Sequence, residues 1–316
     1  MSEPKSGPPA RDTLSSGDEA APDRAESTRG NPARMTDHVV RAITDDGSFR
    51  VITARTTLTT QRAARVQRTT GKTTEHFANL LTGAVLFRET MAPDLRVQVI
   101  LSGAGGRGRL VADSHPSGET RGLVQLGKGS APIELGGDAR IMLMRSLSSG
   151  RLQQGVVEAS EEGGISAAFM SYMQQSEQVV SMLAVDSVIE ADQVVAAGGY
   201  LVQLLPEVDR SVLGVMTERL EDFRSVARWV SQDDFTPDLL MQELLYGIPY
   251  TRLEEDAVRF GCWCSETTML GALTSLPHAD IEELVKDGEV LEIECDYCHT
   301  EYKVAPQRLR GMLSPS

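Results

Sequence analysis

The chain has 316 residues, 41% of them hydrophobic and 24% charged, with a net charge of −14 and an isoelectric point near 4.9. This composition is typical of a globular protein that buries its core in one large domain or two unequal ones. An acidic surface repels phosphate backbones, so we expect no nucleic-acid partner. The longest mainly apolar run, Phe77–Phe87, is far shorter than the roughly 20 residues that cross a bilayer, so we expect no membrane partner either.

The first segment, Met1–Arg34, consists mostly of Ser, Pro, Gly, Ala and mixed charges and has almost nothing to bury. Such a composition cannot offset the entropy of ordering a chain, so we predict a disordered tail. The segment lacks the apolar core of a secretory signal and is too acidic for an organellar transit peptide, which predicts a cytoplasmic protein. Met35 follows the tail and is an alternative start.

Residues 35–206 alternate short β-branched runs with breaks rich in Gly and Asp, a pattern that predicts strands joined by turns. The predicted strands are Val39–Ile43, Phe49–Arg55, Leu95–Leu101, Arg109–Asp113, Gly122–Gln125, Ala139–Met144, Gly155–Ala159, Val179–Val185 and Gly199–Leu205. Thr74–Met91 and Gly164–Gln175 have helical spacing. The Gly-rich run Gly103–Arg109 lacks the ending of a phosphate-binding loop and is predicted to be a hairpin turn. We therefore predict an α+β domain, with a large, mostly antiparallel sheet covered by helices.

Residues 207–255 form a predicted helical linker. Apolar residues at spacings of three and four predict one amphipathic helix that continues to a break at Ser231–Asp234. Thr236 and Pro237 predict the cap and first turn of a second helix, which ends near Gly247. The apolar stripe needs a partner to cover it, and the pattern favours ordinary packing on the sheet. Its residues are Val212, Met216, Leu220, Phe223, Ala227 and Val230.

All four cysteines lie in the C-terminal module, residues 256–316, as Cys262-Trp263-Cys264 and Cys295-Asp296-Tyr297-Cys298, with 30 residues between the pairs. Two close pairs that flank a small fold suit one tetrahedral zinc ion bound by four thiolates. Four protein ligands leave no open position for a catalytic water, and no other motif indicates an active site, so we expect that the protein is not an enzyme. His278 and His299 are expected to be surface residues.

Short helices at Leu270–Leu273 and Ile281–Val285 and a strand at Val290–Glu294 are predicted between the cysteine pairs. A mini-core is expected from four side chains: Leu273, Leu276, Leu284 and Val285. So small a module needs a staple, and zinc supplies one.

The Cys-Trp-Cys pair suggests a redox role for the site. A pair this tight can close only a small, strained disulfide, and strained disulfides are the labile ones. Zinc keeps thiols as thiolates, the form that oxidants attack, and an oxidised sulfur no longer binds the metal. Structural zinc contributes about 10–16 kcal/mol in small peptides, as much as the whole stability of many domains. Oxidation is therefore expected to unfold the module.

With these motifs the chain resembles the 33-kilodalton heat-shock protein family (33 kDa chaperonins), which are redox-regulated holdase chaperones. The resemblance extends over residues 37–312. Besides the cysteine motifs, similar text occurs at 136–159 (GGDARIMLMRSLSSGRLQQGVVEA), 201–207 (LVQLLPE), 244–247 (LLYG) and 273–302 (LTSLPHADIEELVKDGEVLEIECDYCHTEY). The chain departs from the family in its N-terminal tail and at His299, where Gly is common.

The resemblance implies that the reduced, zinc-bound form is inactive. Peroxide or hypochlorite would form the disulfides Cys262–Cys264 and Cys295–Cys298, although four cysteines allow three pairings. Zinc release would then unfold the module and the linker, whose apolar stripe would in that case be a face that masks another surface. The exposed apolar surface would bind unfolding client proteins without ATP. A homodimer of the oxidised form is also implied.

The alternative is a constitutive zinc ribbon that binds nucleic acid or a protein partner. Acidic residues outnumber the basic residues near the cysteines, which weighs against nucleic acid. These basic residues are Arg252, Arg259, Lys286, Lys303, Arg308 and Arg310.

Overall fold

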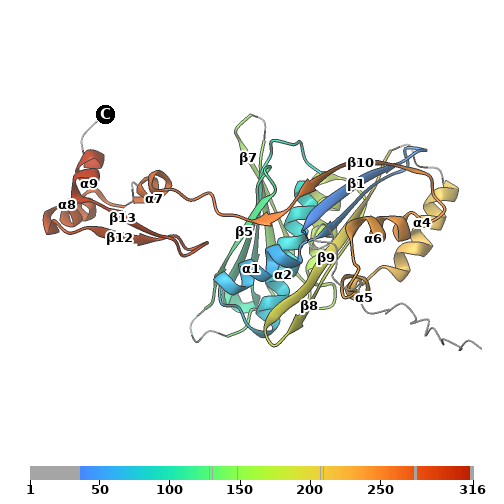
Figure 1. Ribbon diagram of the computed structural model, residues 1–316, viewed down its shortest axis with the longest axis horizontal. Helices are drawn as coiled ribbons and strands as arrows, with labels where there is room; N and C mark the ends of the chain where they lie inside the picture. Colours follow the sequence, from blue (N-terminus) through green and yellow to red (C-terminus); the bar gives the residue numbers. More distant parts are fainter. Residues whose placement is uncertain are drawn as a thin grey trace, which may run out of the picture. The chain divides into compact units, whose positions relative to one another are not determined.

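A long helix between two β-sheets organises this chain, whose structure is a computed structural model (Figure 1). The structure describes residues 36–313 except 128, 130, 148, 207, 209 and 274–275, so the predicted tail Met1–Arg34 lies outside the described residues. The α+β class predicted from the sequence is confirmed, and the strands of the large domain are divided between two sheets.

The first sheet has five strands in the order β10-β1-β2-β9-β8, all of them antiparallel. Its strands are β1 (His38–Thr44), β2 (Phe49–Arg55), β8 (Ser181–Glu190), β9 (Gln193–Leu204) and β10 (Tyr250–Ala257). Successive side chains enter different clusters: Val39 and Ile52 belong to one buried core, and Val40 and Val51 to another. Both faces of this sheet are therefore covered, as the alternating directions of strand side chains allow.

The second sheet has six strands in the order β11-β5-β4-β3-β6-β7. Its strands are β3 (Val97–Ser102), β4 (Arg109–Ser114), β5 (Glu119–Gln125), β6 (Arg140–Ser146), β7 (Leu152–Glu158) and β11 (Arg259–Phe260). All neighbours are antiparallel except the short β11, which runs parallel to β5. Between β3 and β4, the Gly-rich run contains the 3-10 turn η2 (Ala104–Gly106), so the predicted hairpin turn is confirmed.

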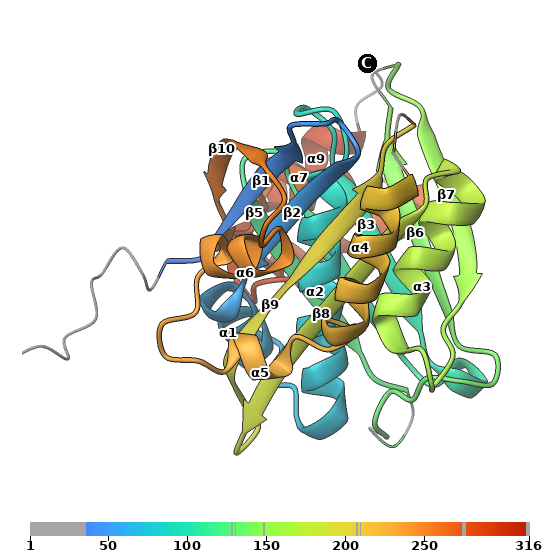
Figure 2. The ribbon, with the colours of Figure 1, turned by 90° about the vertical axis from the view of Figure 1, so that its right-hand side faces the viewer.

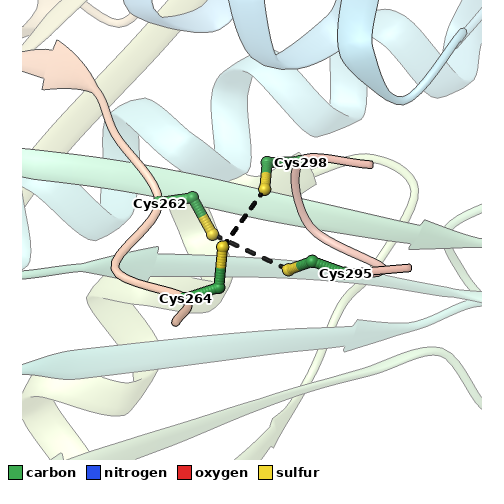
Figure 3. A group of neighbouring side chains, drawn as sticks. All are labelled: Cys262, Cys264, Cys295 and Cys298. Carbon is green, nitrogen blue, oxygen red and sulfur yellow. Dashed lines mark hydrogen bonds between the residues drawn. The ribbon is translucent and has the colours of Figure 1, made fainter. Parts of the chain in front are cut away.

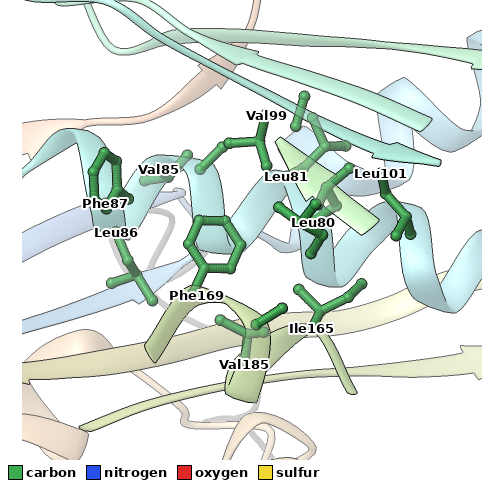
Figure 4. Packing of buried hydrophobic residues seen from close by; sticks show 14 of the residues in the cluster. Leu80, Leu81, Val85, Leu86, Phe87, Val99, Leu101, Ile165, Phe169 and Val185 are labelled. Atoms are coloured by element: carbon green, nitrogen blue, oxygen red, sulfur yellow. The ribbon is translucent and has the colours of Figure 1, made fainter. Parts of the chain in front are cut away.

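Helix α2 (Gly71–Arg88) lies between the sheets, and 14 of its 18 residues are buried. A helix that is apolar on all sides is one that belongs in a core. Its side chains pack with the inner faces of both sheets and with α3 (Gly164–Tyr172), which continues as a π-turn, η3 (Met173–Glu177) (Figure 4). The predicted helices Thr74–Met91 and Gly164–Gln175 correspond to α2 and α3, and all nine predicted strands overlap observed ones.

Helix α1 (Thr57–Val66) was not predicted, because its three threonines among ten residues favour strands over helices. A buried carboxylate from outside the helix stabilises its start. Asp37 Oδ2 accepts hydrogen bonds from the backbone N–H and the hydroxyl of Thr59, at 2.6 and 2.7 Å. The helix therefore depends on a tertiary contact that its own sequence does not reveal.

Three helices cover the outer face of the five-stranded sheet: α4 (Arg210–Asp222), α5 (Ala227–Val230) and α6 (Pro237–Leu244) (Figure 2). The prediction of one continuous helix up to Ser231 is wrong. Asp186 of β8 accepts hydrogen bonds from the N–H groups of Val226 and Ala227, at 2.6 and 3.1 Å, and so stabilises a separate helical start. The predicted cap of the next helix is confirmed, since Thr236 Oγ1 accepts a hydrogen bond from the N–H of Leu239.

Strand β10 (Tyr250–Ala257) was missed, because its sequence (YTRLEEDA) is charged and mostly exposed.

The cysteine module contains α7 (Glu266–Leu273), α8 (His278–Asp287), β12 (Leu291–Glu294), β13 (Glu301–Val304) and α9 (Pro306–Leu313). The expected mini-core is wrong: Leu276 is exposed and Leu273, Leu284 and Val285 are only half-buried. Ile281, Val304 and Leu309 are buried instead, because β13 and α9, which were not predicted, complete the module. None of the described helices is long and apolar enough to cross a membrane.

Candidate metal centre

Backbone pairing to the six-stranded sheet positions the first cysteine pair. Arg259 and Phe260 of β11 pair with Glu119 and Thr120 of β5, and the N–H of Gly261 then donates to the carbonyl of Thr120 at 3.1 Å. A side chain at Gly261 would collide with that of Glu119. The chain therefore passes close to β5 just before it reaches Cys262 and Cys264.

A tight turn between β12 and β13 presents the second pair. The carbonyl of Cys295 accepts hydrogen bonds from the N–H groups of Cys298 and His299, at 3.2 and 2.8 Å, and the N–H of Cys295 donates to the carbonyl of Thr300. His299 has φ = 57°, the left-handed region that favours glycine. Its imidazole contacts the carboxylate of Glu294. This agrees with its predicted position on the surface; the side chain of His278 lies outside the described part.

The four cysteine sulfurs converge, as the spacing predicted: all lie within 4.8 Å of one another (Figure 3). The Sγ atoms of Cys262 and Cys295 are 3.8 Å apart, and those of Cys264 and Cys298 are 3.4 Å apart. Zinc–sulfur bonds of about 2.3 Å in a tetrahedron place sulfurs about 3.8 Å apart. The donor set therefore has the chemistry and the spacing that a zinc ion needs.

The four thiols differ in environment. Burial raises the pKa of Cys295 to about 12 and also raises the pKa of Cys262. Burial acts in the same direction on Cys298, but hydrogen bonds with Thr300, Cys264 and Cys262 outweigh it, and the pKa of this thiol falls to about 7. The hydroxyl of Tyr302 donates to Cys264 Sγ at 3.0 Å. In the folded module Cys298 is thus the sulfur that ionises most readily of these three, and thiolates are the nucleophilic form.

The large domain supplies contacts that the sequence did not predict. Arg121 of β5 donates to Cys262 Sγ at 3.3 Å, and Gln67, at the end of α1, donates to the carbonyls of Asp296 and Tyr297, at 2.8 and 3.1 Å. In the sequence Arg121 is a polar residue next to the predicted strand Gly122–Gln125, and Gln67 lies in a segment without a predicted element, so neither residue reveals what it contacts.

The predicted masking face lies on the five-stranded sheet. Met216, Phe223 and Val230 are buried, whereas Val212 and Leu220 are partly buried and pack against the same cluster. The sheet residues that these helices cover include Phe49, Val51, Ala184, Tyr200 and Val202. The apolar stripe is therefore divided between helices but serves one surface.

The basic residues near the cysteines are mostly neutralised. Five of the six form ion pairs with carboxylates: Arg252, Arg259, Lys286, Lys303 and Arg308. A surface whose cations are already paired attracts a phosphate backbone only weakly.

Comparisons with known proteins agree with the motifs. The sequence model of the family described as Hsp33 protein matches residues 37–305. A curated protein named 33 kDa chaperonin from Syntrophotalea carbinolica is 29% identical over 291 residues, which are 89% of this chain and 100% of that protein. Its namesake from Symbiobacterium thermophilum is 30% identical over 294 residues, covering 88% and 99%. The 33 kDa chaperonin of Bacillus subtilis is 26% identical over 287 residues, covering 87% and 98%.

The fold also has a solved counterpart. The crystal structure of the 33 kDa chaperonin (heat shock protein 33 homolog) from Thermotoga maritima matches with a TM-score of 0.74 and 21% sequence identity. The match covers 88% of this chain and 98% of that one. At this identity the likeness shows a common fold.

Proposed function

The chain belongs to the Hsp33 family, and from this premise we propose that it is a redox-regulated, ATP-independent holdase chaperone. One observation carries the proposal: four cysteine sulfurs lie within 4.8 Å of one another in a module with little apolar core of its own. Such a module depends on its sulfurs for its fold, so chemistry at the sulfurs controls the fold. The curated relatives are named chaperonins, and we infer no enzymatic activity.

In the reduced form Cys262, Cys264, Cys295 and Cys298 hold one zinc ion, and the protein is inactive. Zinc, when bound, keeps the four sulfurs as thiolates and links the loop after β11 to the β12–β13 hairpin. The side chains of Arg121 and Tyr302 donate hydrogen bonds to two of these sulfurs and favour their negative charge.

Oxidation converts the ligands into disulfides. The thiolates of Cys262 and Cys264 lose two electrons to one hydrogen peroxide, which takes up two protons and becomes two waters as the S–S bond forms. A second peroxide does the same at Cys295 and Cys298. Disulfide sulfurs no longer bind zinc, so the ion leaves. All six sulfur pairs are within reach, and the pairing of neighbours rests on the family resemblance.

Loss of the metal unfolds the module and then the linker. The chain divides, on this proposal, into a tail (1–34), a large domain (35–206), a helical linker (207–255) and the redox module (256–316). Undocking of α4, α5 and α6 uncovers the apolar outer face of the five-stranded sheet. An exposed apolar face of this kind binds unfolding proteins and prevents their aggregation. The active, oxidised protein works in the cytoplasm as a homodimer, without nucleic-acid or membrane partners.

The test measures zinc release, disulfide formation and client aggregation in one experiment. Reduced, zinc-loaded protein is treated with hydrogen peroxide at mild heat, while a colorimetric chelator reports zinc and light scattering reports the aggregation of a chemically unfolded enzyme. We expect zinc release, the disulfides Cys262–Cys264 and Cys295–Cys298 in peptide maps, and suppressed aggregation. Protein re-reduced in the presence of zinc is the control and should be inactive. Zinc release with unchanged client aggregation would refute the holdase function. Retained zinc with nucleic acid bound at physiological salt would support a constitutive zinc ribbon.

A further inference from the structure

One guanidinium group joins the two cysteine pairs. The guanidinium of Arg121 lies 3.8 Å from the ring centre of Trp263, the middle residue of the first pair, and 4.0 Å from that of Tyr297, inside the second. Such distances are typical of strong cation–π contacts. Trp263 and Tyr297, which each lie within one cysteine pair and do not bind metal, therefore both pack on the side chain of Arg121.

The same side chain contacts a metal-site sulfur and a buried acid. Arg121 donates to Cys262 Sγ at 3.3 Å and, through Nε and Nη2, to Asp113 Oδ2 at 3.2 Å each. Asp113 is fully buried, and only 9% of Arg121 is exposed. A buried cation needs charged or polar partners. Here the sheet provides Asp113, and the cysteine module provides Cys262 and the two aromatic rings.

The strand register places Arg121 beside Asp113, on the face of the sheet that the cysteine module contacts. Gln98, Asp113 and Arg121 are direct neighbours across β3, β4 and β5. They lie on the face opposite the core, because Val97 and Val99 of β3 point into it. Gln98 donates to the hydroxyl of Tyr297 at 3.3 Å. This polar row thus forms a docking surface for the cysteine module.

Arg96 offers an internal comparison. It also forms an ion pair with Asp113 and lies 5.1 Å from the ring centre of Trp263. Its side chain is 39% exposed, and its hydrogen bonds reach Asp113 but not a cysteine sulfur. Loss of Arg121 would leave Asp113 paired with Arg96, so the sheet should tolerate that change.

We propose that Arg121 is the positioning residue that couples the redox state of Cys262 to the docking of the cysteine module on the six-stranded sheet. This inference rests on the redox function proposed above. The guanidinium donates to a thiolate in the reduced protein, and charge-assisted hydrogen bonds of this kind are strong. A disulfide sulfur is neutral and a weak acceptor. Oxidation of the first pair therefore weakens the contact that holds both pairs on the sheet.

Three variants of the full-length, reduced, zinc-loaded protein test the proposal: Arg121→Met, Arg121→Lys and, as matched control, Arg96→Met. The readouts are the rate of zinc transfer to a chelator and the hydrogen exchange of residues 258–264 and 295–300. Substitutions of groups that support metal ligands commonly change metal affinity 10–100-fold. We expect Arg121→Met to speed zinc transfer about tenfold and to lower protection of both segments. Arg121→Lys should be intermediate, because it keeps the charge but not the planar stack. Arg96→Met should stay within about twofold of wild type by the same reasoning.

A redox comparison separates positioning from a merely structural role. After peroxide treatment, wild type and Arg121→Met should show equal exchange in residues 118–121, since oxidation has already removed the contact in both. Exchange within α2 checks that the large domain is intact. Trp263→Leu removes the stack on Arg121 without altering the sheet. It should lower the exchange protection of Tyr297 and its neighbours, as Arg121→Met does.

The outcomes are distinct from those of the holdase test. If Arg121→Met releases zinc at the rate of Arg96→Met, with unchanged exchange, the coupling is refuted even where oxidised wild type protects clients. Equal zinc release from Trp263→Leu and wild type would refute it as well. A wild type that fails to protect clients after losing zinc refutes the proposed function, whereas the measurements on the reduced variants still decide the role of Arg121.

Discussion

The hydroxyl of Tyr200, fully buried in β9, donates a hydrogen bond to the carbonyl oxygen of Phe223 at 3.0 Å. Phe223 lies just after α4, where the predicted continuous helix is interrupted, so this carbonyl lacks a continuing helical partner. The phenol therefore satisfies a buried acceptor of the linker from the sheet that the linker covers. Together with the hydrogen bonds that Asp186 accepts from Val226 and Ala227, this contact fastens the middle of the linker to the large domain.

Tyr200→Phe should loosen that attachment. It leaves a buried carbonyl unsatisfied, which costs about 1–3 kcal/mol. We expect faster hydrogen exchange across residues 210–230 in the reduced protein and a shorter lag before activation by peroxide. Tyr246→Phe is the control, because Tyr246 is 77% exposed. Exchange equal to wild type would show that Tyr200 does not hold the linker.

Phe223→Asp should uncouple masking from oxidation. The ring of Phe223 stacks on Trp229 at 5.5 Å and meets Tyr200 edge-on at 6.5 Å. Truncating such a buried ring costs about 3–5 kcal/mol, and a buried carboxylate without a partner adds to that cost. We expect the reduced variant to suppress client aggregation without oxidant. Val215→Asp, on a 49% exposed residue of α4, places the same charge outside the core and should stay inactive until oxidised. A reduced Phe223→Asp protein as inactive as this control would count against linker masking.

Features that depend on residues close together in the sequence were predicted, whereas features that depend on contacts between distant residues were not. Cysteine spacing predicted the convergence of the sulfurs, because each pair is local and only the gap had to close. Short β-branched runs likewise indicated every strand of the two large sheets except β10, whose face is charged and exposed, and the two-residue β11. Helix α1 and the break before α5 depend on Asp37 and Asp186, which are distant in sequence. The role of Arg121 could not be predicted for the same reason, since its partners come from three other segments.

Removal of zinc under reducing conditions should unfold the module but not the large domain. Among the described residues of 261–311, the buried apolar side chains other than Cys295 are Ile281, Val304 and Leu309. Each contributes about 1.5–3 kcal/mol, less together than the 10–16 kcal/mol that structural zinc supplies. After chelation we expect exchange protection to vanish in β12 and β13 and to persist in α2. Zinc, but not magnesium, should restore it, because thiolates are soft ligands. A protected hairpin after complete zinc removal would contradict this account.

Zinc affinity should rise steeply with pH. Cys262 and Cys295 bind protons at neutral pH in the folded module, because burial raises the pKa of both thiols, and an unfolded thiol, with a pKa near 8.5, does so as well. Each of these protons must leave when the sulfur becomes a ligand, so each contributes about tenfold in affinity per pH unit. Two such thiols predict a rise of at least about 100-fold per unit between pH 6 and 7.5. Competition with a chromophoric chelator, corrected for its own protonation, measures the slope. The double variant Cys262→Ser/Cys295→Ser should bind weakly and with a shallower slope, since serine has no proton to lose in this range. A wild-type slope below tenfold per unit would mean that these two sulfurs are not ligands.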